Sequence, residues 1–197
     1  MTTTEPDSPP SPLSEMEDIL MEEDFQTLYQ PVDEENFYEK LHVSLGEDEK
    51  GRQFNIQLHF INDVSRAQGG EDEPEDIVLL QMFLLLPYSI TDATFMPTAR
   101  LILMLNRILP LGAFGISEVD GAMYYQNNAG LTDRAMDPDV LVESMRIIGF
   151  FVTRFTDLLE EVATGARTFE AAAQALFDQG IQVPPLTGLP PPFKAEE

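Results

Sequence analysis

Few residues of this chain are suited to catalysis or to metal binding. The sequence has two histidines and no cysteine, which excludes thiol catalysis, a cysteine-ligated metal and a disulfide framework. His42 and His59 fall on the polar sides of two alternating segments. Antiparallel pairing of these segments places His42 opposite Gln57 and His59 opposite Lys40, so the histidines do not face each other. We therefore interpret both as exposed strand residues and predict no metal site.

Motifs for nucleophilic or phosphate chemistry are also missing. The sequence contains neither a Gly-x-Ser-x-Gly elbow nor a glycine-rich phosphate-binding loop. The acidic run over residues 71–76 lacks the glycine and the spaced oxygen ligands of a calcium loop. Among 35 acidic residues, no carboxylate pair for acid–base catalysis can be singled out. The sequence predicts a protein without enzymatic activity and without a cofactor.

Phe150 is the residue whose position most suggests a function. At 100° per residue it falls at the centre of the polar face of a predicted long helix, with Arg146 and Arg154 four residues to either side. An exposed phenylalanine surrounded by charge is typical of a contact with another chain. The alternative is that the first helix or the C-terminal segment folds over it. Tyr124, on the less apolar face of a predicted hairpin, is a weaker candidate of the same kind.

Arg100 and Arg107 are further candidates for partner binding. They lie seven residues apart in the segment 98–109, whose other residues are apolar except for Thr98 and Asn106. The two arginines therefore share one narrow stripe of a predicted helix that is apolar on most of its surface. Such a helix either lies deep in the fold or forms part of a subunit interface.

The composition is that of an acidic globular protein. The chain has 197 residues, of which 43% are hydrophobic, and this length favours a single domain with tails. The formal charge of −24 excludes binding to nucleic acid through phosphate neutralisation. We interpret the acidic residues mainly as a solvated surface, with steering of a basic partner or binding of divalent ions as alternatives.

No segment has the pattern of a secretory signal or of a membrane span. The N-terminus has no basic region followed by an apolar core. The longest apolar run, residues 77–86, is far shorter than the roughly 20 residues that a span requires. Because polybasic segments are also missing, we predict a cytoplasmic protein that does not bind membranes.

Hydrophobic periodicity predicts the elements that must position these residues. A helix is expected from about residue 14 to Tyr29, ended by Pro31. Alternation over residues 41–45 and 54–60 predicts an antiparallel hairpin, and the run 77–86 predicts a central strand. A helix over 98–109 follows.

The second half of the sequence predicts another hairpin and a long helix. Asp120-Gly121 is a strong turn signal and, as a two-residue loop, would pair Ile116 with Tyr125. Asp137-Pro138 then opens a helix whose apolar residues recur at steps of three and four. Those residues are Leu141, Met145, Ile148, Val152, Phe155, Leu159 and Val162. A short helix over 169–177 comes last.

The expected fold is α+β, with a five-stranded antiparallel sheet, packed helices and the order α-β-β-β-α-β-β-α. We expect a domain over residues 13–180 between two tails. Residues 1–12 are polar, contain four prolines and are expected to be disordered. Residues 181–197 form a proline-rich C-terminal tail.

One stretch of the sequence, together with the long helix predicted after it, resembles the YbjN-like family. The stretch is Leu109-Pro-Leu-Gly-Ala-Phe-Gly-Ile-Ser-Glu-Val-Asp-Gly-Ala-Met-Tyr-Tyr125. In that family a Leu-Pro-x-Gly-x-Phe motif, like residues 109–114 here, leads into a hairpin with an Asp-Gly turn. The fold of the family looks like that of type III secretion chaperones. The resemblance covers roughly residues 15–165. It implies a regulatory or chaperone-like role, binding of extended client segments and dimerisation.

We therefore predict a non-enzymatic protein-interaction module, chaperone-like or regulatory. Its partner is a protein or client of unknown identity, a second copy of the chain being one alternative. The central strand is apolar on both faces, so one face of the sheet needs a cover from a second copy, a client segment or the terminal arms. The competing hypothesis is a small-ligand binder or an enzyme with a pocket between the sheet and the long helix.

Overall fold

The computed structural model describes residues 10–69 and 77–181. Within them the elements are, in chain order, α1 (Pro12–Glu22), β1 (Thr27–Gln30), β2 (Lys40–Glu47), β3 (Gln53–Phe60), α2 (Ile61–Ala67), β4 (Val78–Ser89), α3 (Asp92–Leu105), β5 (Ala113–Ile116), β6 (Ala122–Leu131), α4 (Pro138–Ala163) and α5 (Phe169–Asp178). Most of both expected tails and the acidic run 71–76 lie outside the described residues. Ser11 and Pro12 lie within the predicted N-terminal tail, but Ser11 is the N-cap of α1 and Pro12 is its first residue.

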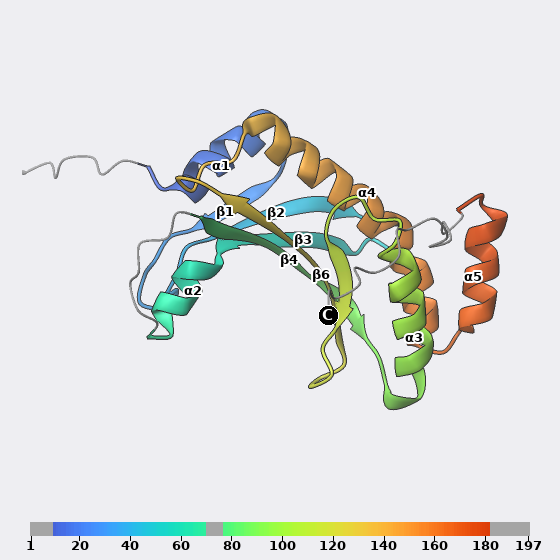
Figure 1. The fold of residues 1–197 in the computed structure, drawn as a ribbon. Helices are drawn as coiled ribbons and strands as arrows, with labels where there is room; N and C mark the ends of the chain where they lie inside the picture. The colour runs from blue at the N-terminus through green and yellow to red at the C-terminus, as the bar shows by residue number, and fades with distance from the viewer. Residues whose placement is uncertain (1–9, 70–76, 182–197) are drawn as a thin grey trace, which may run out of the picture.

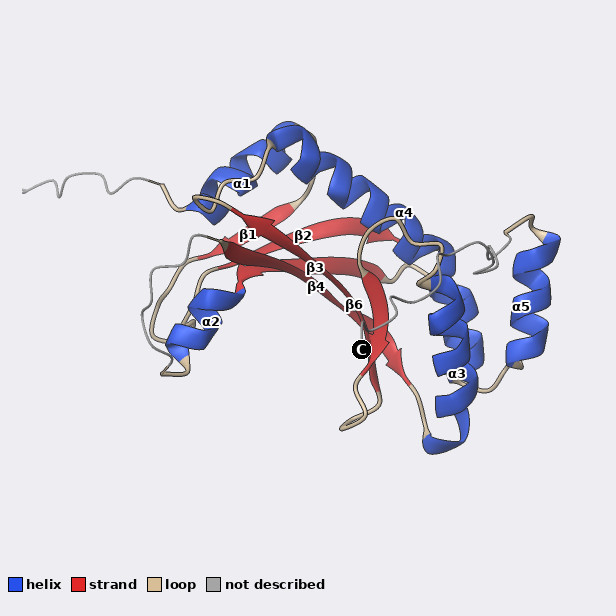
Figure 2. Cartoon of the chain, in the orientation of Figure 1, coloured by secondary structure: helices blue, strands red, loops and turns tan. Residues whose placement is uncertain are grey.

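One curved antiparallel sheet organises the molecule. Its strand order is β1-β2-β3-β4-β6-β5, and every neighbouring pair is antiparallel. Figures 1 and 2 show α1 and α4 over one face and α2 beyond the other, beside the ends of β3 and β4. Helix α3 packs against α4 and β5, and α5 packs against α3. The α+β class is confirmed, but the sheet has six strands and not five.

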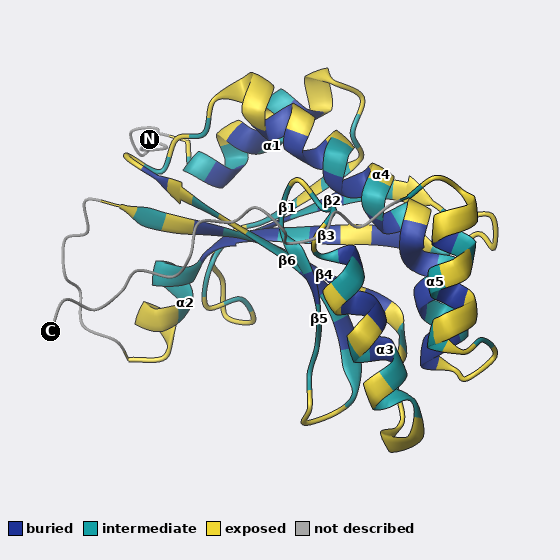
Figure 3. Ribbon diagram, turned by 45° about the vertical axis from the view of Figure 1, so that its right-hand side comes forward, coloured by how far each residue is buried: buried dark blue, intermediate teal, exposed yellow. Residues whose placement is uncertain are grey.

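Helix α4 covers one face of the sheet together with α1. The Asp137 side chain accepts hydrogen bonds from the backbone N–H groups of Asp139 and Val140, and Pro138 occupies the first turn, which together fix where the helix begins. All seven residues of the predicted apolar stripe are buried. Figure 3 shows this division along α4, with buried residues toward the sheet and exposed ones outward. Among the described helices, none has the length and apolar character needed to cross a membrane.

The sixth strand arises because α1 is shorter than expected. The predicted helix to Tyr29 is wrong: Asp24 adopts a left-handed conformation with φ of 64°, and the N–H of Phe25 bonds back to the carbonyl of Leu20. This arrangement ends a helix. The chain then turns into β1, where the Glu17 carboxylate accepts the N–H of Tyr29 at 3.0 Å. A long-range contact of this kind leaves no periodic trace in the sequence.

Helix α3 begins earlier and ends earlier than the predicted range 98–109. A reciprocal capping box between Thr91 and Thr94 starts it, and Pro97 lies inside it. At the other end, the Asn106 side chain turns to the backbone of Phe114. Helix α2, which follows β3 directly, has no counterpart among the predicted elements.

The second hairpin is paired differently from the prediction. Ile116 pairs with Met123 and Phe114 with Tyr125, because residues 118–121 form the loop in place of Asp120-Gly121 alone. The N–H of Gly121 bonds to the carbonyl of Ser117 and closes this longer turn. The shift moves each partner by two residues, which keeps every side chain on its predicted face. For the first hairpin, the predicted pairing of His42 with Gln57 is confirmed.

Candidate protein-binding site on helix α4

Phe150 lies on the outer surface of α4 with 61% of its side chain exposed. Arg146 and Arg154 lie one turn before and one turn after it, and all three side chains are exposed. The helix therefore brings these three predicted residues together on one stripe. Neither α1 nor α5 covers Phe150, whose ring meets Phe151 edge-on at a centroid distance of 5.1 Å.

A hollow of about 360 Å³ opens beside Phe150. Its walls come from α4 and from the turn between β2 and β3, two segments about a hundred residues apart in the sequence. The lining residues are Glu47, Asp48, Glu49, Phe150, Thr153, Arg154 and Asp157. One aromatic wall thus faces a rim that holds four carboxylates and one guanidinium.

The turn that forms this rim is held in place by Asp48. Its carboxylate accepts the backbone N–H groups of Lys50 and Arg52, both at 2.9 Å, and pairs with the Arg52 side chain at 2.5 Å. Burial raises the pKa of Asp48, but the hydrogen bonds from Arg52 and Lys50 outweigh it and hold that pKa below its usual range. Asp48 therefore remains ionised, and the turn keeps its shape near neutral pH.

Ion pairs join this turn to α4. Lys50 pairs with Asp157 at 2.8 Å and also with Glu160, while Arg52 reaches Asp157 at 3.1 Å and Glu160 at 2.9 Å. The hydrogen bonds that the Lys50 ammonium donates to the carboxylates of Asp157 and Glu160 raise the pKa of Lys50. These pairs neutralise the inner carboxylates and fix the turn beside Phe150.

Glu47 and Glu49 remain as the outward charges of the hollow. Both are exposed, and within the described residues neither forms an ion pair. The Glu47 carboxylate accepts only a neutral hydrogen bond, from the Gln53 amide at 3.0 Å. A cationic side chain placed against Phe150 would therefore meet carboxylates that have no other counter-ion.

Arg146 and Arg154 contact the neighbouring helices. Arg146 pairs with Glu23, just after α1, at 2.6 Å, and Arg154 donates to the side chain of Gln179, just after α5. Both contacts are exposed to solvent, so they contribute little to stability. Arg146 is thereby tied to the end of α1, whereas Arg154 is also a lining residue of the hollow beside Phe150.

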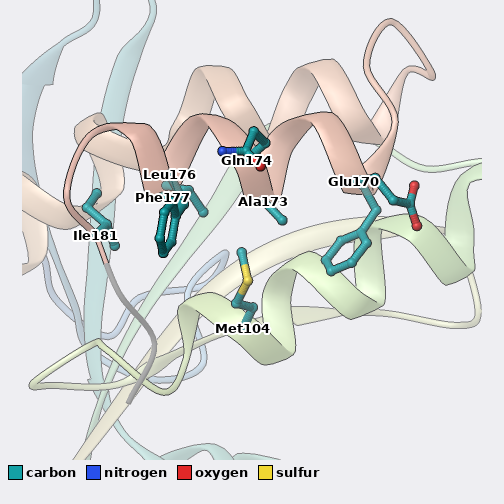
Figure 4. Close-up of a pocket in the computed structure, with 8 residues that line it drawn as sticks. Met104, Glu170, Ala173, Gln174, Leu176, Phe177 and Ile181 are labelled. Carbon is teal, nitrogen blue, oxygen red and sulfur yellow. The ribbon is translucent and has the colours of Figure 1, made fainter. Parts of the chain in front are cut away.

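Arg100 and Arg107 belong to a different surface. Arg100 lies on α3, pairs with Glu170 at 2.9 Å and stacks over the Phe169 ring at 3.8 Å from its centroid. These contacts close one end of a groove of about 440 Å³ between α3 and α5. Figure 4 shows Met104 pointing from α3 toward α5 within this groove. Arg107 follows the end of α3 and is exposed.

Tyr124 and the two histidines lie on the face of the sheet that points away from α4. The expectation of two exposed histidines is wrong for His59, which is 7% exposed and packs against Tyr38 at 5.6 Å. His42 is half-buried, with Nε2 at 3.2 Å from the Gln30 side-chain oxygen. Among the described residues no cluster of His, Asp and Glu is arranged to hold a metal ion.

Sequence reasoning located Phe150 but not its surroundings. The acidic turn over residues 47–49 carried a signal only in its charge, and nothing in the sequence placed it next to α4. The alternative hypothesis places a ligand pocket between the sheet and α4. Fully buried side chains from both layers meet there, among them Val43, Leu58, Leu84, Met145 and Val152.

A comparison of the chain with protein-family models and with curated proteins finds no match.

Proposed function

We propose that this protein is a non-enzymatic protein-interaction module, chaperone-like or regulatory, and that it acts in the cytoplasm. The hollow beside Phe150 is its binding site. Its partner offers an extended segment that combines lysine or arginine with an apolar side chain. The observation that carries the proposal is an exposed phenylalanine beside Glu47 and Glu49, two carboxylates without a counter-ion among the described residues.

Three features support this assignment. An aromatic side chain at the edge of a preformed hollow is the usual form of an interaction hot spot. The net charge of −24 attracts basic partners over long distances and speeds their association. The Asp48–Arg52 pair and its links to α4 preorganise the rim, which lowers the entropic cost of binding. The resemblance to YbjN-like proteins points to the same class of function and remains a prediction.

A charge-reversal design tests the site. The probe is a fluorescein-labelled peptide of alternating lysine and leucine, and its binding is followed by fluorescence anisotropy. Phe150→Asp adds a negative charge, so attraction between charges alone would make the peptide bind more tightly. If Phe150 is the apolar anchor, the affinity falls instead, by about 30-fold for the roughly 2 kcal/mol typical of such an anchor.

Leu103→Asp is the matched control. Leu103 is 68% exposed on α3, so this substitution adds the same charge at another exposed apolar position. It should leave the affinity unchanged or slightly higher. Both variants should unfold within about 0.5 kcal/mol of the wild type, because neither side chain is buried. Equal binding of the peptide by wild type and Phe150→Asp would refute the proposed site.

A further inference from the structure

The hollow beside Phe150 carries charges of both signs that form no ion pair within the described residues. Glu47 and Glu49 supply the two carboxylates. Arg154 lines the same hollow, and its guanidinium donates to a neutral partner, the side-chain oxygen of Gln179. The best match to this hollow is therefore a segment that combines an apolar side chain for Phe150 with both a cation and an anion.

The chain itself contains such a sequence. Beyond the described residues it continues with residues 182–197, which we call the C-terminal segment. Lys194 is the one basic residue of this segment. Phe193 precedes it directly, and Glu196 and Glu197 follow one residue later. The segment thus supplies the apolar side chain, the cation and the anions that complement the hollow.

The last described residues lie beside this hollow. Arg154 on α4 bonds to the Gln179 side chain, and the described residues end two positions later, at Ile181. About 12 residues of extended chain span up to about 40 Å, which is the reach of Phe193 from Ile181. Phe150 is one helical turn, about 6 Å, from Arg154. Phe193 is therefore able to reach Phe150 without any change in the described fold.

Attachment to the same chain favours the contact. A short tether gives an effective concentration of about 1 mM. A contact with a dissociation constant of about 0.5 mM would then fill the hollow in about two thirds of the molecules. Residues 190–192, directly before Phe193, are all proline. Because proline fixes φ, less backbone entropy is lost when the residues that follow are held in place.

We propose that the C-terminal segment occupies the Phe150 hollow of its own chain and competes there with the partner. Phe193 contacts Phe150, and Lys194 pairs with Glu47 and Glu49. When about two thirds of the hollows are filled, the partner binds about threefold more weakly than it binds an open hollow. The segment is thus a built-in competitor that sets how tightly a partner must bind. This inference rests on the proposed function, because it concerns the regulation of the same site.

Phe193→Ala tests the competition on the full chain. Anisotropy of the same lysine–leucine peptide measures the affinity, and this substitution does not change the net charge. The peptide should bind about threefold more tightly to Phe193→Ala than to the wild type. Leu189→Ala is the matched control, because it removes an apolar side chain of the same segment that has no charged neighbour, and it should bind as the wild type does. In a Phe150→Asp background, Phe193→Ala should bring no gain.

Disulfide formation detects the contact without any peptide. The natural chain has no cysteine, so pairs of cysteines can be introduced at chosen positions. Thr153 lines the hollow, whereas Leu103 is exposed on α3. Thr153→Cys combined with Ala195→Cys should form an intramolecular disulfide several-fold faster than Leu103→Cys combined with Ala195→Cys. Non-reducing electrophoresis after mild oxidation measures the two rates.

The outcomes separate this competitor from the proposed function. If Phe150→Asp weakens peptide binding but Phe193→Ala leaves it unchanged, the competitor is overturned and the proposed function stands. Equal oxidation rates of the two cysteine pairs would also overturn the competitor. If Phe150→Asp has no effect on the peptide, the proposed function fails, and faster oxidation of the Thr153–Ala195 pair would still support contact of the C-terminal segment with the hollow.

Discussion

Arg134 binds Asp63 through both terminal nitrogens of its guanidinium group, at 2.8 and 2.6 Å. The pair joins the loop before α4 to α2, and the Arg134 guanidinium also lies over the Phe60 ring at 4.7 Å from its centroid. Arg134 and its neighbour Asp133 both have φ near 56°, a left-handed conformation that costs free energy in residues other than glycine. The bidentate contact holds the loop in that conformation.

Arg134→Gln should therefore destabilise the fold by about 2 kcal/mol, since it leaves a partly buried Asp63 carboxylate without its strongest partner. Urea unfolding followed by circular dichroism measures the difference. Arg146→Gln is the control, because its pair with Glu23 has side chains that are 53% and 47% exposed and should contribute less than about 0.5 kcal/mol. Equal losses in the two variants would contradict the anchoring role of Arg134.

Periodicity was sufficient to predict the layers of this fold. The stripe from Leu141 to Val162 identified α4, and alternation identified β2, β3 and the faces of β6. These patterns are strong because each reflects one face packed on a core. The scarcity of acidic residues in the strands was also predictable from the sequence, although only the topology shows that these strands lie side by side.

The errors occur where a contact between distant residues decides the local structure. Tyr29 belongs to a strand because it pairs with Leu41 of β2, and α3 ends where the Asn106 side chain bonds to Phe114. The candidate site follows the same rule. The exposure of Phe150 followed from helix geometry, whereas the rim of Glu47 and Glu49 depends on how the β2–β3 turn packs on α4.

His59 makes stability depend on pH just below neutrality. Burial lowers its pKa, and the charge of Lys40 lowers it further, although the Gln81 hydrogen bond and the charge of Asp63 partly oppose this. As the pH falls below the ordinary histidine value of 6.5, the unfolded chain takes up a proton that the folded chain does not. The free energy of unfolding should therefore decrease as the pH falls through about 6.5 and level off once the folded ring is protonated.

His59→Gln should weaken this pH dependence, because glutamine keeps a hydrogen-bonding side chain but does not titrate in that range. Chemical unfolding of wild type and variant at matched pH values measures the two slopes. His42 has a lowered pKa as well, so some dependence should remain in the variant. An identical slope in both proteins would show that His59 is not the group responsible.

Asn106 protects the outer edge of β5. Its side-chain amide makes the two hydrogen bonds that a neighbouring strand would make: it accepts the N–H of Phe114 and donates to the Phe114 carbonyl. The Phe114 side chain itself is buried. Asn106→Ala removes both bonds and should lower the free energy of unfolding by about 1–2 kcal/mol. It also exposes strand groups that can pair with other chains, so aggregation on storage should increase.

Asn106→Asp keeps the acceptor for the Phe114 N–H and loses the donor to its carbonyl, so its stability should fall between those of the alanine variant and the wild type. Unfolding curves and turbidity of the three proteins measure both effects, and an alanine variant as stable and as soluble as the wild type would show that the β5 edge needs no such protection.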